Sequence, residues 1–132
     1  MSLIMGDLMV LDRWRWLSNK INNNMNYSDK KVLEVGCGSG AFTIGASSLG
    51  YKTLGLSWDN KNQIKALHRA EICKKNASFD ILDVRELDKR TDLKESFKYI
   101  ICTENIEHII DDDKLMMDMN NCLEKDGILL LT

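Results

Sequence analysis

The residues with the clearest chemical meaning lie in one short stretch, where a carboxylate precedes three alternating glycines. Glu34 stands near the end of an apolar run, and Gly36, Gly38 and Gly40 follow it, with Cys37 between the first two glycines. A glycine at every second position lets the backbone turn sharply and approach a ligand that a Cβ atom would keep away. We therefore predict a loop that holds a nucleotide-like ligand. The alternative is that the glycines only close a tight turn between a strand and a helix.

The spacing of these glycines separates the loop from two common phosphate-binding patterns. Dinucleotide-binding enzymes use G-x-G-x-x-G, and phosphate loops end in Gly-Lys-Ser/Thr; this chain has glycines at every second position and no such lysine. An NAD-binding enzyme would share the expected fold, but the glycine spacing disfavours it.

A second group of chemically capable side chains consists of Glu104, Glu107 and His108. Two carboxylates and an imidazole are donor types that bind Mg²⁺, Mn²⁺ or Zn²⁺. An imidazole also titrates near neutral pH, which suits a general base. Three roles therefore stay open for His108: a structural role at a helix start, a general base that deprotonates an acceptor hydroxyl, and a metal ligand.

The elements that must position these groups alternate between apolar strands and amphipathic helices. Strands are predicted over residues 31–35, 52–56, 78–82, 98–102 and 128–131, and helices over residues 7–23, 41–49 and 61–74 and from the acidic run 111–113 onward. Strict alternation of strand and helix predicts an α/β fold with a doubly wound parallel sheet and right-handed crossovers.

Within these elements the pattern makes several local predictions. The first helix has two apolar faces, one formed by Val10, Trp14, Leu17 and Ile21 and the other by Met5, Met9 and Trp16. The helix over residues 61–74 places Ala66, Leu67, Ala70 and Cys73 on one face. Residues 124–127 are predicted to form a turn before the last strand.

The glycine loop and its strand resemble the first motif of the class I S-adenosylmethionine-dependent methyltransferases, in which the loop cradles the methionine part of the cofactor. The resemblance covers essentially residues 32–132. It implies a Rossmann-like sheet with five strands in the order 3-2-1-4-5, S-adenosyl-L-methionine as cofactor, and a cofactor-binding domain over residues 31–132 after an N-terminal helix and connection over residues 1–30. The cofactor-binding residues that it implies in this motif are Glu34, Gly36, Cys37, Gly38 and Gly40.

Residues 51–59 resemble the second motif of the family, a strand whose end meets the cofactor ribose. Most members place Asp or Glu there, because a carboxylate accepts hydrogen bonds from both ribose hydroxyls. This chain has Ser57 at that position. Some relatives, such as the fatty-acid cyclopropane synthases, also carry a hydroxyl residue there. Asp59 is either a second acceptor or a helix cap. Trp58 either covers the adenine face or belongs to the core.

Residues 78–87 and 97–108 resemble the third and fourth motifs. The third implies that Asp83 accepts from the adenine amine and that the amide of Val84 reads the ring; the alternative is a solvated acid after a strand. The fourth implies that the carbonyl of Thr103 meets the cofactor ammonium. Its Glu-x-x-Glu-His segment is similar to quinone-pathway O-methyltransferases and small-RNA 2′-O-methyltransferases, some of which hold a divalent metal there. His108 is the candidate catalytic residue, and whether Glu104, Glu107 and His108 bind a metal stays open.

Composition limits the classes of partner. The chain has 132 residues, with 18 Lys and Arg against 20 Asp and Glu and a net charge of −2, so one domain without a strong nucleic-acid surface is expected. The four cysteines are dispersed without a C-x-x-C pair, which predicts reduced, mostly buried thiols. No run approaches the roughly 18 apolar residues of a membrane span. We expect a soluble, cytoplasmic protein that does not bind membranes.

The end of the chain shapes the functional prediction. Family members usually continue with a helix and an antiparallel strand pair, so we expect a shortened member that lacks strands 6 and 7 and one wall of the acceptor pocket. We predict a methyltransferase for a small-molecule acceptor, with O-, N- or C-methylation undetermined and with weak or absent activity in this chain. The alternative is a catalytically silent cofactor-binding or interaction module. The apolar edge of the last strand and the second face of the first helix also predict self-association.

Overall fold

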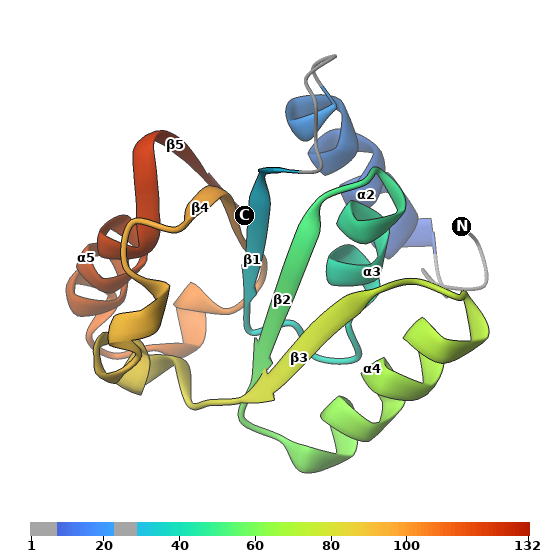
Figure 1. Cartoon of the computed structure of the whole chain (residues 1–132). Helices are drawn as coiled ribbons and strands as arrows, with labels where there is room; N and C mark the ends of the chain where they lie inside the picture. The colour runs from blue at the N-terminus through green and yellow to red at the C-terminus, as the bar shows by residue number, and fades with distance from the viewer. Residues whose placement is uncertain (1–7, 23–28) are drawn as a thin grey trace.

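The computed structural model describes residues 8–22 and 29–132, and its centre is a sheet of five parallel strands. The strands run in the order β3-β2-β1-β4-β5 (Figure 1). Their bounds are Lys31–Val35 for β1, Lys52–Ser57 for β2, Ala77–Ile81 for β3, Phe97–Cys102 for β4 and Leu123–Leu131 for β5. The predicted fold class and strand order are thereby confirmed.

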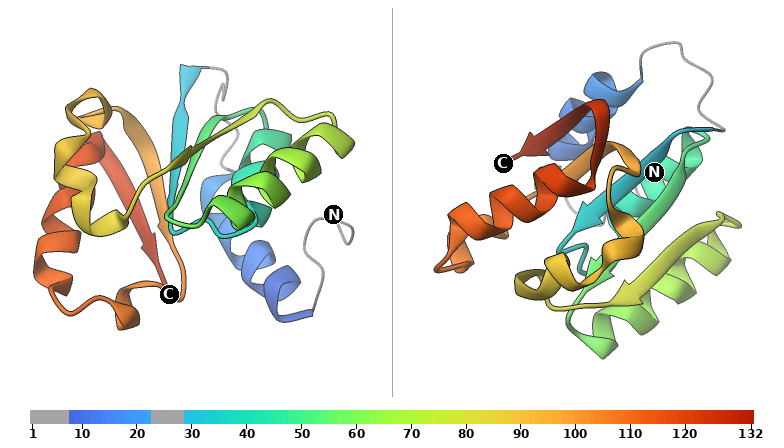
Figure 2. Two further views of the ribbon diagram at one scale, coloured as in Figure 1. Left: turned by 90° about the horizontal axis from the view of Figure 1, so that it is seen from below. Right: turned by 60° about the vertical axis from the view of Figure 1, so that its left-hand side comes forward.

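Helices cover both faces of this sheet, as a doubly wound fold requires (Figure 2). The α-helices are α2 (Leu8–Ile21), α3 (Ala41–Ser48), α4 (Asn60–Ile72) and α5 (Asp112–Cys122), and the short 3₁₀ helices are η2 (Val84–Lys89), η3 (Thr91–Leu93) and η4 (Ile106–His108). Helices α2, α3 and α4 lie on one side of the sheet, and α5 lies on the other with η2.

Two apolar cores result, because successive side chains of a strand point to opposite faces. In β1, Val32 belongs to the core that includes residues of α2, α3 and α4, whereas Leu33 belongs to the core that includes residues of α5 and η2. Both side chains are fully buried, as expected for a central parallel strand covered on two faces.

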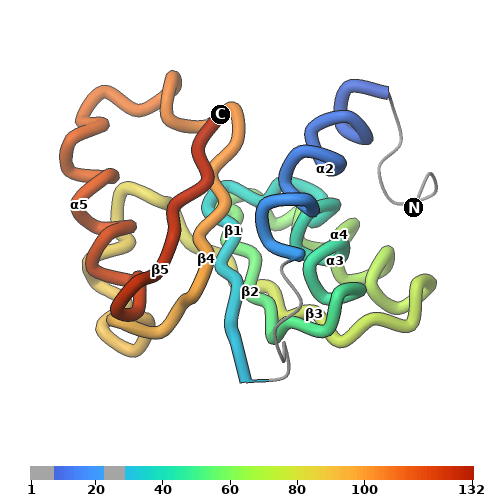
Figure 3. Tube along the Cα trace, turned by 90° about the horizontal axis from the view of Figure 1, so that it is seen from above, coloured from blue at the N-terminus to red at the C-terminus, as the bar shows by residue number. Residues whose placement is uncertain are grey.

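Helix α2 lies next to α3 and contacts it (Figure 3). The ring of Trp14 stacks on Phe42 with 6.3 Å between centroids, and a Cβ atom on Gly45 would lie 2.8 Å from the indole. Trp14, Leu17 and Ile21 are buried, which confirms the predicted inner stripe. Of the predicted outer face, Met9 and Trp16 are exposed, and Met5 lies outside the described residues.

Helix α4 follows the prediction with one exception. The Asp59 side chain caps it by accepting from the Lys61 amide at 2.9 Å, and Ala66 and Ala70 are buried. Leu67 is 49% exposed, so its assignment to the same face as Ala66 and Ala70 was wrong. It directly follows Ala66, and successive helical residues are turned by about 100°, which carries its side chain away from the sheet.

Strand β5 differs from the prediction at its start. The predicted turn over residues 124–127 lies inside the strand, which begins at Leu123. The register jumps there, since Phe97 pairs with Leu123 but Tyr99 already pairs with Ile128. Asp126 has a positive φ of 62°, and its carbonyl accepts a hydrogen bond from Lys98 Nζ at 2.9 Å. The turn chemistry was recognised correctly, but it forms a bulge in a continuous strand.

The four cysteines are free, and three of them, Cys37, Cys102 and Cys122, are buried. Burial raises the pKa of Cys102 and of Cys122 to about 11.

Across residues 8–22 and 29–132, no helix combines the length and the apolar character needed to cross a bilayer.

Candidate functional site

A cavity of about 410 Å³ lies at the edge of the sheet where β1, β2 and β3 end. Ligands of open α/β sheets bind at this edge. The cavity is lined by Gly36, Trp58, Asp83, Val84, Arg85, Asn105, His108 and Ile109. Five predicted site residues are thus brought together: Gly36, Trp58, Asp83, Val84 and His108. The other predicted residues, Glu34, Cys37, Gly38, Gly40, Ser57 and Thr103, do not line it.

The loop after β1 needs its glycines for different reasons. Gly36 has φ 75°, and a Cβ atom there would lie 2.7 Å from Asn105 Nδ2. Gly40 has φ 80°, and a Cβ atom there would lie 2.6 Å from the Phe79 ring. A Cβ atom on Gly38 would meet no atom within 4 Å. Gly40 therefore serves packing, Gly36 admits the loop after β4, and Gly38 faces open space.

Glu34 fixes the two ends of the glycine loop to each other. Its Oε2 accepts hydrogen bonds from the backbone amide of Thr43 at 2.8 Å and from the Thr43 hydroxyl at 2.5 Å. Thr43 belongs to α3, which follows the loop, whereas Glu34 belongs to β1, which precedes it. Burial raises the Glu34 pKa from 4.5 to about 7, against the opposing effect of the Thr43 hydrogen bonds.

Cys37 connects the same loop to β2 and to its own continuation. Its backbone amide donates to the carbonyl of Leu56 at 2.8 Å, and its carbonyl accepts from the amide of Gly40 at 2.8 Å. The thiol is buried, and its pKa is raised mainly by that burial and further by the charge of Glu34. The side chain of Cys37 therefore packs behind the loop and is not a reactive thiolate.

The residues at the end of β2 have two different roles: Ser57 and Asp59 stabilise the turn into α4, and Trp58 lines the cavity. Ser57 is buried, and its hydroxyl oxygen accepts from the Asp59 amide at 3.3 Å. Since Asp59 caps α4, the helix-cap interpretation of this residue is the one that the structure supports. Trp58 is 76% exposed and lines the cavity, so the alternative that it belongs to the core is wrong.

Asp83 is held in place by Arg85, two residues further along. The Nε atom of Arg85 donates to both carboxylate oxygens of Asp83 at 3.0 Å, and the Arg85 backbone amide donates to Oδ1 at 3.0 Å. These hydrogen bonds, led by those of the side chain, lower the Asp83 pKa to about 2. Asp83 is therefore an ion-paired cap of η2 at the cavity wall, and Val84 beside it is buried.

The loop after β4 places His108 in the cavity wall, whereas Glu104 of the same loop does not line the cavity. Glu104 forms an ion pair with Arg13 of α2. The His108 side chain is 76% exposed, with Nε2 3.9 Å from Glu107 Oε1. Within the part of the chain that the structure describes, no three His, Cys, Asp or Glu side chains are grouped closely enough to hold a metal ion. Glu104, Glu107 and His108 consequently do not converge on one point.

Sequence reasoning missed three cavity residues, Arg85, Asn105 and Ile109. Arg85 had a local signal, since a basic residue two positions after an acidic cap can turn back to pair with it. Asn105 had none, because its place depends on the approach of the β4 loop to Gly36, far away in the sequence.

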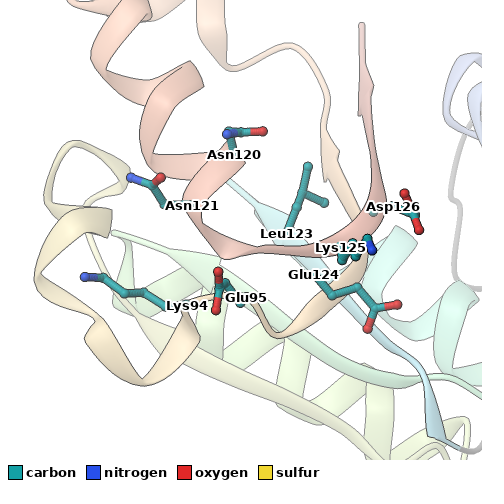
Figure 4. Close-up of a pocket in the computed structure, with 9 residues that line it drawn as sticks. Lys94, Glu95, Asn120, Asn121, Leu123, Glu124, Lys125 and Asp126 are labelled. Carbon is teal, nitrogen blue, oxygen red and sulfur yellow. The ribbon is translucent and has the colours of Figure 1, made fainter.

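One further cavity adjoins the site, and another lies at the opposite end of the sheet. One of about 210 Å³ shares Arg85, His108 and Ile109 with the first and extends toward α5. A hollow of about 640 Å³ lies where β4 and β5 begin, at the opposite end of these strands, and contains none of the predicted site residues (Figure 4).

Comparison with known proteins identifies the family. Residues 12–132 match the family model described as a methyltransferase domain, and the chain belongs to this family of S-adenosylmethionine-dependent methyltransferases. A ubiquinone biosynthesis O-methyltransferase of Glaesserella parasuis serovar 5 is 28% identical over 123 residues, which are 91% of this chain and 50% of the relative. A mitochondrial protein of the same name from Bos taurus is 29% identical over 80% of this chain and 29% of its own length. The chain thus spans half or less of the length of these two relatives.

Solved structures agree on the fold. A protein from Pyrococcus horikoshii OT3 superposes with a TM-score of 0.80 at 21% identity, over 96% of this chain and 59% of that one. An S-adenosylmethionine-dependent methyltransferase from Clostridium acetobutylicum ATCC 824 superposes with a TM-score of 0.77 at 18% identity, over 98% and 52% of the two chains. These similarities confirm the Rossmann-like methyltransferase fold.

Proposed function

We propose that the chain binds S-adenosyl-L-methionine in the 410 Å³ cavity and contributes the cofactor half of a small-molecule O-methyltransferase. The observation that carries this proposal is that strand ends far apart in sequence place Gly36, Trp58, Asp83 and Val84 around one cavity. The names of the curated relatives support a hydroxyl group as the acceptor.

The residues around the cavity fit such a cofactor. Its adenosine part is matched by Trp58, which offers an exposed aromatic face, and by Asp83, a carboxylate that can accept from an amine. Its amino-acid part is matched by the loop at Gly36, where a side chain would have no room. Three residues outside the cavity wall hold the glycine loop in place through hydrogen bonds: Glu34, Cys37 and Gly40. Ser57 holds the turn after β2 in the same way.

When bound, the cofactor supplies an electrophilic methyl group on a sulfonium. The protein has to align an acceptor with it and, for a hydroxyl acceptor, to remove one proton. His108 lies at the wall shared by the two neighbouring cavities, and an imidazole is suited to receive that proton at neutral pH. We assign His108 the role of general base on this ground.

Titration calorimetry tests the binding step. S-adenosylhomocysteine is expected to bind to the chain and NAD is not. Gly38→Val is expected to abolish binding, because its side chain enters the open space beside the loop. Since Gly38 has a φ of +50°, which strains a β-branched residue, circular dichroism is needed to show that the variant is folded. Binding of NAD without binding of S-adenosylhomocysteine would refute the proposal. A folded chain that binds S-adenosylhomocysteine, yet supports no methyl transfer to any hydroxyl acceptor, would favour the catalytically silent module.

A further inference from the structure

We propose that Lys114 of α5 is a positioning residue for adenine recognition, because it holds the segment that keeps Asp83 at the cavity wall. This inference deepens the proposed function and rests on it. Asp83 is the carboxylate that we expect to accept from the adenine amine, and it directly precedes η2. Lys114 lines the neighbouring 210 Å³ cavity and not the 410 Å³ cavity, so its effect on the cofactor is indirect.

The Lys114 ammonium joins η2 to α5 through three hydrogen bonds. Its Nζ donates to the carbonyl of Arg85 at 3.0 Å, to Asp88 Oδ1 at 2.8 Å and to Asp118 Oδ2 at 2.5 Å. An ammonium has three hydrogens, so these acceptors can use all of them. Arg85 and Asp88 belong to η2, whereas Asp118 lies on α5, one turn after Lys114. Helix η2 is therefore attached to α5 at two of its six residues.

Asp118 keeps the Lys114 side chain in one place. The Asp118 side chain is only 9% exposed, and burying a carboxylate is unfavourable unless an opposite charge lies against it. Lys114 supplies that charge. The hydrogen bonds of Asp118 and Asp88 raise the pKa of Lys114, so the ammonium stays charged at neutral pH. A lysine anchored in this way to a buried group of α5 is well suited to fix the position of η2.

Arg85 extends this contact to Asp83. The Arg85 amide donates to Asp83 Oδ1, and the Arg85 Nε donates to both oxygens of that carboxylate, each at 3.0 Å. Lys114 holds the carbonyl of the same arginine. The place of Arg85 therefore sets where the Asp83 carboxylate lies, and Lys114 helps to set the place of Arg85. Since an N–H···O hydrogen bond needs a separation of about 2.7–3.2 Å, a small shift of Asp83 weakens its bond to the adenine amine.

The test compares two ligands that differ only at the adenine amine. S-adenosylhomocysteine carries this amine, and its analogue with purine in place of adenine has a hydrogen atom there. For the unmodified chain, calorimetry should give roughly 10- to 100-fold tighter binding of S-adenosylhomocysteine, as for a hydrogen bond to a charged group. In Lys114→Met this ratio should fall by roughly 3- to 10-fold, because Asp83 is less well placed. The affinity for the purine analogue should change by less than about twofold, because it makes no such bond.

Two further variants keep the test decisive. Lys89→Met removes another lysine of η2, whose Nζ donates to Glu86 of the same helix at 2.6 Å, and it should leave the ratio unchanged. Lys114→Met leaves the buried Asp118 without its counter-charge, so circular dichroism has to show that the variant is folded. If it is not, Asp118→Asn is added to remove that charge, and the ratio in the double variant should fall in the same way.

The outcomes separate this inference from the proposed function. If the unmodified chain binds neither ligand, the proposed function itself is wrong. If it binds both equally, Asp83 does not receive the amine, so the role of Lys114 is wrong and the cofactor site stands. The same conclusion follows if the Lys114 variants leave the ratio unchanged or weaken both ligands equally, since a general loss of structure would lower both affinities together.

Discussion

Glu34 and Thr43 are joined through a single carboxylate oxygen, which accepts from both the amide and the hydroxyl of Thr43. The pair is buried, and it bridges the strand and the helix on either side of the glycine loop. The second carboxylate oxygen of Glu34 has no contact of this kind with Thr43, and burial disfavours the charged form of the group.

The raised pKa of Glu34 predicts a particular dependence of stability on pH. The folded chain binds the proton with a pKa of about 7, against 4.5 for an ordinary glutamate. Between these values the folded state carries more protons than the unfolded state, so the free energy of unfolding falls as the pH rises from about 4.5 to about 7. The whole effect has an upper limit of about 3 kcal/mol.

Glu34→Gln is the matched variant, since its amide oxygen still accepts from Thr43 and it carries no charge. We expect the difference in unfolding free energy between variant and unmodified chain, from urea titrations, to move in favour of the variant as the pH rises through this range. Asp83 contributes little to the slope in this range, because its folded pKa of about 2 and its ordinary value of 3.8 both lie below it. A difference that is constant with pH would contradict the assignment.

The two tryptophans of α2 provide an internal comparison for the packing of this helix. Trp14 is buried against Phe42 and Gly45, whereas Trp16 is 40% exposed. Trp14→Ala should destabilise the chain by about 3–5 kcal/mol, and Trp16→Ala by about 0.5 kcal/mol. Urea unfolding measures both. Similar losses for the two variants would mean that α2 does not pack as described.

Gly40 and Gly38 should respond differently to alanine. Gly40→Ala combines a positive φ with a contact of 2.6 Å to the Phe79 ring, so a loss of about 2–5 kcal/mol in stability is expected. Gly38→Ala meets no neighbouring atom and should lose about 1–2 kcal/mol from backbone strain alone. Thermal unfolding at one pH compares the two, and the reverse order would contradict the packing of the loop.

His108 should affect turnover and leave cofactor binding unchanged. For the proposed transfer of a methyl group from radiolabelled S-adenosylmethionine to a hydroxyl acceptor, His108→Ala should lower kcat by about 10²- to 10⁴-fold, as for the loss of a general base. The affinity for S-adenosylhomocysteine should change by less than about twofold. His68→Ala, at the exposed histidine of α4, is the control for which kcat should not change. An unchanged kcat in His108→Ala would remove this residue from the mechanism.

Self-association stays a prediction that the edge of the sheet makes testable. Strand β5 pairs with β4 alone among the described strands, and Ile128 and Leu131 on it are 45% and 38% exposed. Light scattering should give a mass of at least twice 15.1 kDa for the unmodified chain. The double variant Ile128→Lys, Leu131→Lys should give a lower mass, because lysines at the strand edge oppose pairing with another strand. Ile110→Lys, at a fully exposed residue off the sheet, should not. A monomer over a wide concentration range would contradict the prediction.

The sequence was most informative where local pattern and topology agree. The starts of β1 and β2 follow from apolar runs, and parallel strands necessarily bring Gly36, Trp58 and Asp83 to one edge. Leu67 was misplaced because adjacent apolar residues on a helix do not show which of them faces the sheet. The bulge in β5 was missed because turn residues look alike in a turn and inside a strand.

The side-chain partners were harder to predict than the elements. Asp59 has the sequence of both a cap and a ligand, and only the hydrogen bond to Lys61 distinguishes them. Glu104 could equally have faced His108, but its pairing with Arg13 depends on where α2 packs. Such contacts join distant parts of the chain, and no short pattern encodes them.

The ion pair between Arg13 and Glu104 spans 91 positions, which has a consequence for the order in which the protein forms. A contact of this span closes a very long loop, whereas β1, α3 and β2 are neighbours in sequence. On the ribosome the glycine loop can therefore be in place while the wall with Asn105 and His108 is still missing. The growing chain acquires a complete cavity only once β4 and the residues after it, as far as Ile109, have emerged.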